Sequence, residues 1–411
     1  MNCSTVHAWQ LAAWRWRNTL RSAAAISEHL DTRTAGIEIA ELLETAIAGP
    51  TDVVFVFASF HHREALEFAI ADIRRTLAPK TIIGLTTESV VGCDLELEGV
   101  AGLSAIAMHL PGVELNAWTT TPKRPVPISR PEAIPEWIGL KDDTKGVFFF
   151  ADPFSTPITR LLPALVNCRG EENPLPIIGG MASGASQARY NRLFLDDKQI
   201  RHGGIGLTVS GPLELDCIVS QGCRPIGEHY RVTKTQGNVV LELGGRPALE
   251  VLQDLARSVG AKERDFLQGG LLLGGVINEH KSYFGRGDFL VRSILGIDRN
   301  RKGIAAGEFY RLGKTVQFHV RDAKTAVEDL QLLLDSQQLG TQPFAGLLVT
   351  CNGRGRSLFH EEDHDLTIIR ERLGEVPIAG FFAAGEIGPI GGKSFLHGHT
   401  ACLTLFRGLQ Q

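Results

Sequence analysis

The residue types best suited to binding chemistry gather near the C-terminus of the chain. Cys351, Asn352, Arg354 and Arg356 lie in the glycine-containing segment CNGRGRS. Glycines in such a loop expose backbone N–H groups, and an arginine beside them supplies a fixed cation for a carboxylate or a phosphate. A cysteine next to two arginines can also have a lowered pKa and react as a nucleophile. The alternative is a structural turn in which Arg354 pairs inside the chain and Cys351 only packs.

A second glycine-rich loop carries an acid. Gly385 and Glu386 open a segment that continues to Lys393. If Glu386 held an ammonium group while Arg354 held a carboxylate, the two side chains would bind an α-amino acid. The alternative is an ion pair that joins the two loops and stabilises the domain. Both interpretations predict that Arg354 and Glu386 lie close together, so a concave pocket between them is what distinguishes binding from stabilisation.

Two histidines offer a different chemistry. His397 and His399 stand two residues apart, a spacing that places both rings on one face of a strand. Imidazoles in that arrangement bind metal ions or serve as axial ligands of haem, whereas a histidine that caps a strand through hydrogen bonds is the alternative. An enzyme with Cys351 as nucleophile and His397 or His399 as base is a further hypothesis, but the chain shows no ordered nucleophile–base–orienter spacing. We therefore predict neither a catalytic residue nor a metal site.

Composition excludes several classes of protein. The 411 residues are 43% hydrophobic and 21% charged with a formal net charge of −4, which excludes global disorder and provides no basic tract for nucleic acid. The seven cysteines are scattered without a CxxC pair, which argues against a disulfide framework or a zinc site and indicates a reducing compartment. No uninterrupted apolar run reaches the ~18–20 residues of a membrane span. We expect a cytoplasmic protein whose residues 1–20 form a poorly ordered extension.

The elements that position the candidate loops come from a pattern that occurs three times. In each copy an apolar run ends in a small residue, a stretch of helical periodicity follows, and a short apolar run then ends at a glycine. The small residue and the glycine lie 26, 28 and 29 residues apart in the three copies: Ala58 and Gly84, Ala151 and Gly179, Cys351 and Gly380. Apolar runs rich in Val and Phe are typical of buried strands, and the separation suits a helical crossover between parallel strands.

Parallel strands bring their carboxyl ends to one edge of a sheet, where the following loops line ligand crevices. We therefore expect the small-residue loop and the glycine loop of each copy to converge on a cleft. The predicted fold class is α/β, with two domains of mixed sheets covered by helices and built from repeated strand–helix–strand units. The boundary is expected near residues 244–247, where a glycine pair precedes a proline that suits the start of a helix.

Two groups of motifs resemble a known family. The run SQGCRPIG at residues 220–227, with Val232-Thr233 and Pro247-Ala248 after it, resembles the end of a FIST N domain and the start of a FIST C domain. The C-terminal motifs resemble the FIST C signature: CNGRG at 351–355, GFF at 380–382, GEIG at 385–388, and His397 with Thr400. The resemblance covers residues 21–406 and implies a FIST N domain at 21–245 and a FIST C domain at 246–411. The first copy departs from the family pattern, because Ser89-Val90 stands where FIST N usually carries Gly-Glu.

The resemblance implies an intracellular module that senses a small ligand, for which amino acids have been proposed. It also implies that some bacterial members bind haem and sense nitric oxide, and that a eukaryotic F-box relative holds protein substrates. The chain carries no appended kinase, methyl-accepting, helix-turn-helix or cyclase segment, so a signal would have to pass through a protein partner.

We therefore predict a cytoplasmic, non-catalytic protein that binds an amino-acid-like or other small polar ligand and signals through a partner, with no nucleic acid, membrane span or metal. No cofactor is predicted. The alternatives are a haem-binding nitric-oxide sensor, a protein-interaction scaffold and a Cys-dependent enzyme. The predicted ligand-binding residues are Cys351, Asn352, Arg354, Arg356, Gly385, Glu386 and His397.

Overall fold

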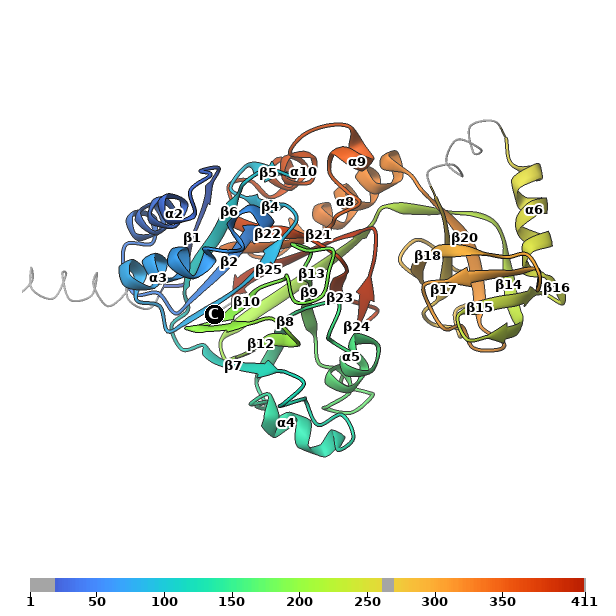
Figure 1. Ribbon diagram of the computed structural model, residues 1–411, viewed down its shortest axis with the longest axis horizontal. Helices are drawn as coiled ribbons and strands as arrows, with labels where there is room; N and C mark the ends of the chain where they lie inside the picture. Colours follow the sequence, from blue (N-terminus) through green and yellow to red (C-terminus); the bar gives the residue numbers. More distant parts are fainter. Residues whose placement is uncertain (1–18, 261–269, 410–411) are drawn as a thin grey trace, which may run out of the picture.

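The computed structural model describes residues 19–260 and 270–409 of the chain (Figure 1). Residues 1–18, which make up most of the predicted N-terminal extension, lie outside the described residues. Within the described ranges, no helix is both long enough and apolar enough to cross a membrane.

Each of the three sequence repeats forms a strand, a helix and a second strand that pairs in parallel with the first. The units are β2 (Val53–Ser59), α3 (Leu66–Leu77) and β3 (Thr81–Thr87); β8 (Thr144–Ala151), α5 (Ile158–Val166) and β9 (Ile177–Met181); and β21 (Ala345–Cys351), α10 (His364–Leu373) and β22 (Ile378–Ala383). The predicted strand–helix–strand repeat is therefore confirmed.

The glycine of each repeat lies inside the second strand of its unit. A Cβ atom added at Gly84, Gly179 or Gly380 would lie 2.4, 2.1 or 1.8 Å from a backbone oxygen of the neighbouring parallel strand. Such approaches are far below van der Waals contact, so only glycine lets the two backbones come this close. Glycine therefore recurs at this position of the repeat because the two parallel strands lie too close together there for a side chain.

Three six-stranded mixed sheets are built around these parallel pairs in the same order. In each sheet the parallel pair lies between a β-hairpin on one side and two further strands on the other. The additional strands of the first sheet are β1 (Arg21–Ser27), β6 (Leu103–His109), β10 (Leu193–Leu195) and β11 (Lys198–Ile200). Those of the second are β7 (Glu114–Thr120), β12 (Gly204–Ser210), β23 (Glu386–Ile390) and β24 (Lys393–His397). Those of the third are β13 (Leu213–Gln221), β25 (Thr400–Gly408), β4 (Val90–Gly92) and β5 (Leu95–Leu97).

The hairpin that completes each sheet comes from a different repeat. The β4–β5 hairpin, which follows the first repeat, pairs with β22 of the third. The β10–β11 hairpin, which follows the second repeat, pairs with β3 of the first, and the β23–β24 hairpin, which follows the third, pairs with β9 of the second. Each repeat thus provides a hairpin to one neighbour and receives a hairpin from the other. As a result, the second and third sheets each contain strands from both sides of residue 245.

The core between the three sheets is built largely from phenylalanines. Phe55 and Phe57 of the first sheet meet Phe148 and Phe150 of the second, and Phe381 of the third stacks on Phe57 with ring centroids 5.0 Å apart. Residues at alternate positions of β2 face the other way, onto the helices. This period of two explains why the strand is apolar throughout: both of its faces are buried.

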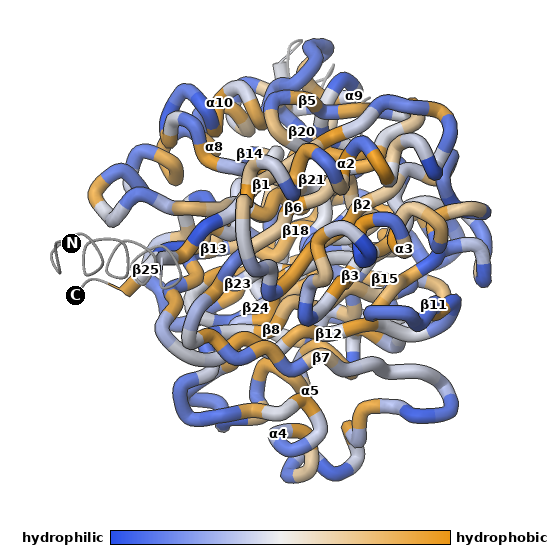
Figure 2. Tube along the Cα trace, turned by 90° about the vertical axis from the view of Figure 1, so that its left-hand side faces the viewer, coloured by the Kyte–Doolittle hydropathy of each residue, from blue (hydrophilic) through white to orange (hydrophobic). Residues whose placement is uncertain are grey.

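Helices cover the outer faces of the sheets (Figure 1). Besides α3, α5 and α10 they are α2 (Thr32–Ile47) on the first sheet and α8 (Ala323–Gln337) on the third, with the short η1 (Phe60–His62), η2 (Pro131–Ala133), α4 (Ile134–Trp137) and α9 (Arg356–Phe359) in loops. The longer two begin at aspartate caps, where Asp31 and Asp322 accept hydrogen bonds from backbone N–H groups of the first turn. Figure 2 shows hydrophobic segments concentrated in strands in the middle of the molecule.

A fourth sheet lies in a separate lobe, on the right of Figure 1. It is antiparallel and is inserted between β13 and α8. Its strands are β14 (Cys223–Gln236), β15 (Val239–Leu243), β16 (Arg246–Pro247), β17 (Leu271–Val276), β18 (Phe289–Asp298), β19 (Gly303–Ala306) and β20 (Thr315–Arg321), and α6 (Ala248–Ser258) packs against it. The predicted α/β class with mixed sheets covered by helices is confirmed.

Candidate functional site

The strand ends of all three repeats meet at one open cavity of about 790 Å³, which we call the central cleft. Each of the six parallel strands places a lining residue just beyond its carboxyl end: Phe60 after β2, Glu88 after β3, Phe154 after β8, Ser183 after β9, Asn352 after β21 and Ala384 after β22. The loops after the parallel strands therefore converge, as the repeat pattern predicts.

The repeats place different chemistry at equivalent positions of the central cleft. Glu88, Ser183 and Ala384 each lie four residues beyond the glycine of their own copy. They contribute a carboxylate, a hydroxyl and a methyl group respectively. The cleft is therefore chemically asymmetric although the backbone around it is repeated, and an asymmetric ligand would have one preferred orientation in it.

Hydrogen bonds join the three repeats at the central cleft. The Asn352 side-chain amide donates to Glu88 Oε2 at 2.5 Å, and the Glu88 backbone N–H donates to Ser183 Oγ at 2.9 Å. The Ser183 hydroxyl donates in turn to the Phe382 carbonyl. Because a carboxylate only accepts, the amide nitrogen of Asn352 must face Glu88, and this leaves Asn352 Oδ1 buried without a partner among the described residues. Asn352 therefore holds the Glu88 carboxylate in place, and the carboxylate can accept further hydrogen bonds from an N–H donor.

Aromatic rings form the walls of the central cleft. Phe60, Phe154 and Tyr190 expose 40%, 47% and 47% of their surface, although side chains of this kind are usually buried. The Arg63 guanidinium lies 5.1 Å from the centroid of the Tyr190 ring. Arg63 and Glu88 are the charged residues of the lining, one of each sign.

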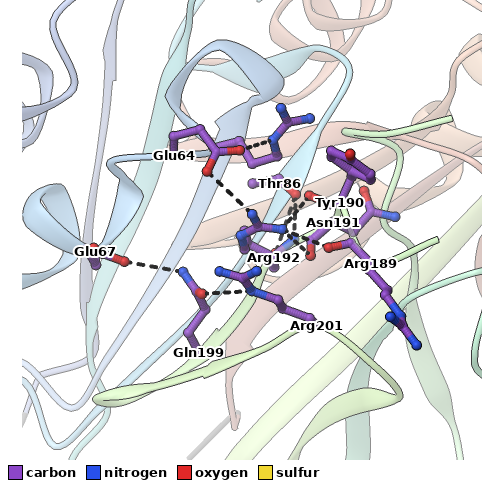
Figure 3. A network of polar contacts seen from close by, with 10 residues as sticks. Glu64, Glu67, Thr86, Arg189, Tyr190, Asn191, Arg192, Gln199 and Arg201 are labelled. Carbon is purple, nitrogen blue, oxygen red and sulfur yellow. Dashed lines mark hydrogen bonds and ion pairs between the residues drawn. The ribbon is translucent and has the colours of Figure 1, made fainter. Parts of the chain in front are cut away.

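A buried arginine fixes the loop that carries Tyr190. Arg192 Nη1 donates to the backbone carbonyls of Arg189, Tyr190 and Asn191 at 3.0, 2.8 and 3.3 Å (Figure 3). Its own backbone N–H donates to Thr86 Oγ1 at 2.9 Å, which ties the loop to the end of β3. Arg189 has a φ of 75°, in the left-handed region, and the hydrogen bonds from Arg192 hold the loop in that conformation. Arg192 is thus a positioning residue for this wall.

The structure places the predicted ligand residue Arg354 inside the protein. Its Nε and Nη2 atoms each donate to a carboxylate oxygen of Asp365 at 2.8 Å, and the two side chains are 0% and 1% exposed. The charge of Arg354 and its hydrogen bonds keep the pKa of Asp365 well below its ordinary value, against the opposing effect of burial. The guanidinium therefore already has a forked carboxylate partner, in the manner of the structural-turn alternative.

Glu386 is also fully buried, but it has no cationic partner in direct contact. Its Oε2 accepts from the backbone N–H and the hydroxyl of Thr400 at 3.1 and 2.7 Å, while Oε1 is unpartnered among the residues described. Burial raises the pKa of Glu386 to about 8, because desolvation outweighs the Thr400 hydrogen bonds and the nearby charge of Arg354. Neither Glu386 nor Arg354 lines the central cleft, so the ligand-binding role predicted for them stays a prediction.

The other predicted residues of these loops have different surroundings. Burial raises the pKa of the Cys351 thiol to about 12, so the thiol stays protonated at neutral pH, and this gives no support to a nucleophilic role. Arg356 is exposed in α9 and pairs with Glu362 at 2.9 Å. Gly385 is buried at the turn between β22 and β23. Of the seven predicted ligand residues, Asn352 lies in the lining of the central cleft.

The two histidines flank a turn. The prediction that both rings lie on one face of a strand is wrong, because His397 ends β24 whereas His399 has a φ of 64° and precedes β25. His397 Nε2 lies 2.8 Å from the Gly388 carbonyl oxygen, and burial lowers its pKa to about 4. This hydrogen bond is the strand-capping arrangement given above as the alternative for His397. Among the described residues, no group of three or more His, Cys, Asp or Glu side chains could hold a metal ion.

Sequence reasoning missed most of the central cleft. The missed lining residues with polar or aromatic side chains include Glu88, Ser183, Phe60, Phe154, Tyr190 and Arg63. A signal for the first four is present in the repeats, since each lies within three residues of the end of a parallel strand, and Asn352 also follows one. The positions of Arg63 and Tyr190 depend on the course of the loops, which the repeat pattern does not specify.

Comparisons with known proteins identify relatives over most of the chain. The model of the FIST N domain matches residues 52–246, and that of the FIST C domain matches residues 248–389. An uncharacterized protein of Mycobacterium tuberculosis (strain ATCC 25618 / H37Rv) is 35% identical over 404 residues, which cover 94% of this chain and 100% of that protein. An uncharacterized protein of Mycobacterium bovis is 32% identical over 407 residues, covering 94% and 99%. Among solved structures, a cyanuric acid hydrolase from A. caulinodans is similar at 8% identity and a TM-score of 0.37, covering 95% of this chain and 100% of that one.

Proposed function

Because the chain belongs to the FIST family, whose domains are known as small-ligand sensory domains, we propose that it binds an amino-acid-like ligand in the central cleft. The observation that carries the proposal is the convergence of all six parallel-strand ends on this one cavity. Its volume of about 790 Å³ lies within the range of small-ligand sites, ~300–1,000 Å³.

The charges and walls of the cleft support this class of ligand. In the proposed complex the Glu88 carboxylate binds the ammonium group, and the Arg63 guanidinium binds the carboxylate. The exposed rings of Phe60, Phe154 and Tyr190 provide apolar surface for the ligand side chain. A site with one cation, one anion and aromatic walls complements a zwitterion better than it complements an ion of a single sign.

The proposed role is sensing without catalysis and without a cofactor, and the signal passes to a protein partner. Ligand binding would raise the stability of the native state through linkage, and a partner would read the resulting change in the cleft loops. We place this activity in the cytoplasm. The six cysteines in the described part of the chain are free, which fits a reducing compartment.

A thermal-shift screen with the proteinogenic amino acids tests the proposal, followed by calorimetric titration of each compound that raises the melting temperature. Glu88→Gln keeps the size and an acceptor but removes the charge, and it is expected to lower the affinity at least ~10-fold, since a charged hydrogen bond is lost. Glu171→Gln, which changes an exposed acid outside the cleft, is the matched control. The proposal fails if no amino acid stabilises the wild type, or if the two variants bind equally well.

A further inference from the structure

A second hollow, which we call the basic groove, lies beside the central cleft. It has a volume of about 1160 Å³ and is lined by the loop at residues 120–130, η2, α4, the start of α5 and Gly203. Its charged lining residues are Lys123, Arg124, Arg130 and Arg160, with Glu136 as the acid. The groove thus carries three excess positive charges on a chain whose formal net charge is −4.

The four cations of the basic groove have no carboxylate partner. All of them are exposed, and in the described structure none forms an ion pair. By contrast, Arg246 in the separate lobe is also exposed but pairs with Asp254 at 2.5 Å. Arg124 instead lies 4.7 Å from the centroid of the Trp137 ring, and Trp137 Nε1 is a buried donor without a partner among the residues described. The groove therefore presents four exposed cations without a carboxylate partner among the described residues, and these would bind negatively charged acceptors.

The base of the groove is apolar and its wall is stiff. Ile128 and Trp137 are partly exposed in the lining, and they pack against a cluster that includes Val126 and Leu161, each 3% exposed. Pro122 and Pro125 lie in the lining, and a proline fixes φ near −65°. A preformed groove loses little conformational entropy when it binds, which favours an extended segment laid along it.

We propose that the basic groove binds an acidic segment of the signalling partner, with glutamate or aspartate side chains on the four cations and apolar side chains on the base. Charge complementarity selects the acidic residues. The apolar base favours a peptide over a nucleic acid, because a phosphate backbone has no apolar side chain to place there. The inference rests on the proposed function only for the identity of the segment as part of a signalling partner.

One loop lies between the two sites. Phe154 lines the central cleft, while Ser155 and Thr156 line the basic groove. Asp152 Oδ2 accepts from Ser155 Oγ at 2.5 Å, and Thr156 Oγ1 donates to the Gly203 carbonyl at 2.9 Å. A ligand that moves Phe154 would therefore also move Ser155 and Thr156 of the basic groove, which lie one and two residues further along the same hydrogen-bonded segment.

Fluorescence anisotropy with a labelled peptide of alternating glutamate and leucine residues tests the inference on the full chain. The wild type is expected to bind this peptide, more weakly as salt is added, and not to bind the matching lysine–leucine peptide. The double charge reversal R124E/R160E is expected to lower the affinity at least ~10-fold, because two attractive contacts become repulsive. Arg299→Glu, which reverses an exposed charge in the fourth-sheet lobe, is expected to bind like the wild type.

Three outcomes would overturn the inference: the wild type does not bind the acidic peptide, the double variant and Arg299→Glu bind it equally, or a single-stranded oligonucleotide displaces it more effectively than the unlabelled peptide does. Thermal melting of each variant verifies that it is folded. The amino-acid titration of R124E/R160E is expected to match the wild type, so failure at the groove and failure at the central cleft are distinguishable.

Discussion

Two residues of the loop after β21, Asn352 and Arg354, each bind a carboxylate, and the two pairs differ in charge, in burial and in the repeats that they join. The Arg354–Asp365 pair lies within the third repeat and is shielded from water, with side chains 0% and 1% exposed. The Asn352–Glu88 pair joins the third repeat to the first and lies at the open central cleft. Asn352 and Arg354 are only two residues apart. The residue directly beyond the strand faces the space shared by the three repeats, whereas the chain then turns back toward its own helix α10 and buries the next polar side chain.

The largest expected difference between the two pairs is the loss of stability when one partner is replaced. Replacing Arg354 by Met would leave the Asp365 carboxylate buried without its partner, and removing one member of a buried ion pair destabilises a protein by about 3–5 kcal/mol. The free energy of unfolding, measured with urea, is expected to fall by that amount. Arg356→Met, which breaks an exposed pair with Glu362, is the control and is expected to change stability by less than about 1 kcal/mol. Equal losses in the two variants would contradict the assignment of Arg354 to a structural role.

The second effect is a pH dependence of the free energy of unfolding, which comes from Glu386. The pKa of Glu386 is about 8 in the folded protein, whereas the ordinary pKa of a glutamate, about 4.5, applies in the unfolded chain. Between these two pH values the folded state therefore holds a proton that the unfolded state has lost. Stability contributed by protonated Glu386 is therefore lost as the pH rises between these values. Glu386→Gln removes the titration, and its stability relative to the wild type is expected to rise with pH by up to ~1.4 kcal/mol per unit.

Urea unfolding of the wild type and Glu386→Gln at several pH values measures this difference. Glu96, whose pKa burial also raises to about 8, is present in both proteins and cancels in the comparison. Parallel stability profiles for the two proteins would show that Glu386 titrates normally in the folded state.

The smallest effect on stability is expected at the central cleft. Asn352→Ala removes the hydrogen bond to Glu88 and a buried acceptor that lacks a partner, so the free energy of unfolding is expected to change by no more than about 1 kcal/mol. Ligand affinity, measured by calorimetry, is expected to fall at least ~10-fold, because the Glu88 carboxylate loses the hydrogen bond from Asn352 that positions it, and a hydrogen bond to a charged group is worth ~1.5–3 kcal/mol. An Asn352→Ala protein that loses stability as Arg354→Met does, yet binds normally, would remove the distinction between the two pairs.

The sequence was sufficient to predict the repeated units because backbone packing leaves a direct trace in it. The approach of parallel strands requires Gly84, Gly179 and Gly380, and burial on both faces requires the Val- and Phe-rich runs. The exchange of hairpins between repeats leaves no comparable trace, because β4, β10 and β23 pair with strands that are distant in the sequence. The three-sheet arrangement therefore could not be derived from local patterns.

The central cleft lies at the strand ends that the sequence pattern indicates, but of the seven predicted ligand residues Asn352 is the one in its lining. The loop after β21 does reach the central cleft, through Asn352, yet Arg354 and Glu386 face inward. Residue type indicates which groups can bind an ion; whether an internal partner such as Asp365 already occupies the group depends on tertiary packing. In the other two repeats, Glu88 and Ser183 lie at equivalent positions beyond the repeat glycine. Their positions indicated the lining of the central cleft better than the residue types of Arg354 and Glu386 did.

A tryptophan reporter in the central cleft tests the central claim most directly. Phe154→Trp places an indole at a wall of the cleft, and Phe309→Trp places one at a 69% exposed position in the separate lobe. Titration with the proteinogenic amino acids is expected to give a saturable change in the emission of Phe154→Trp for at least one compound, relative to the unsubstituted protein, and no change specific to Phe309→Trp. No saturable change in Phe154→Trp, or the same change in both variants, would contradict a ligand site formed by the six strand ends.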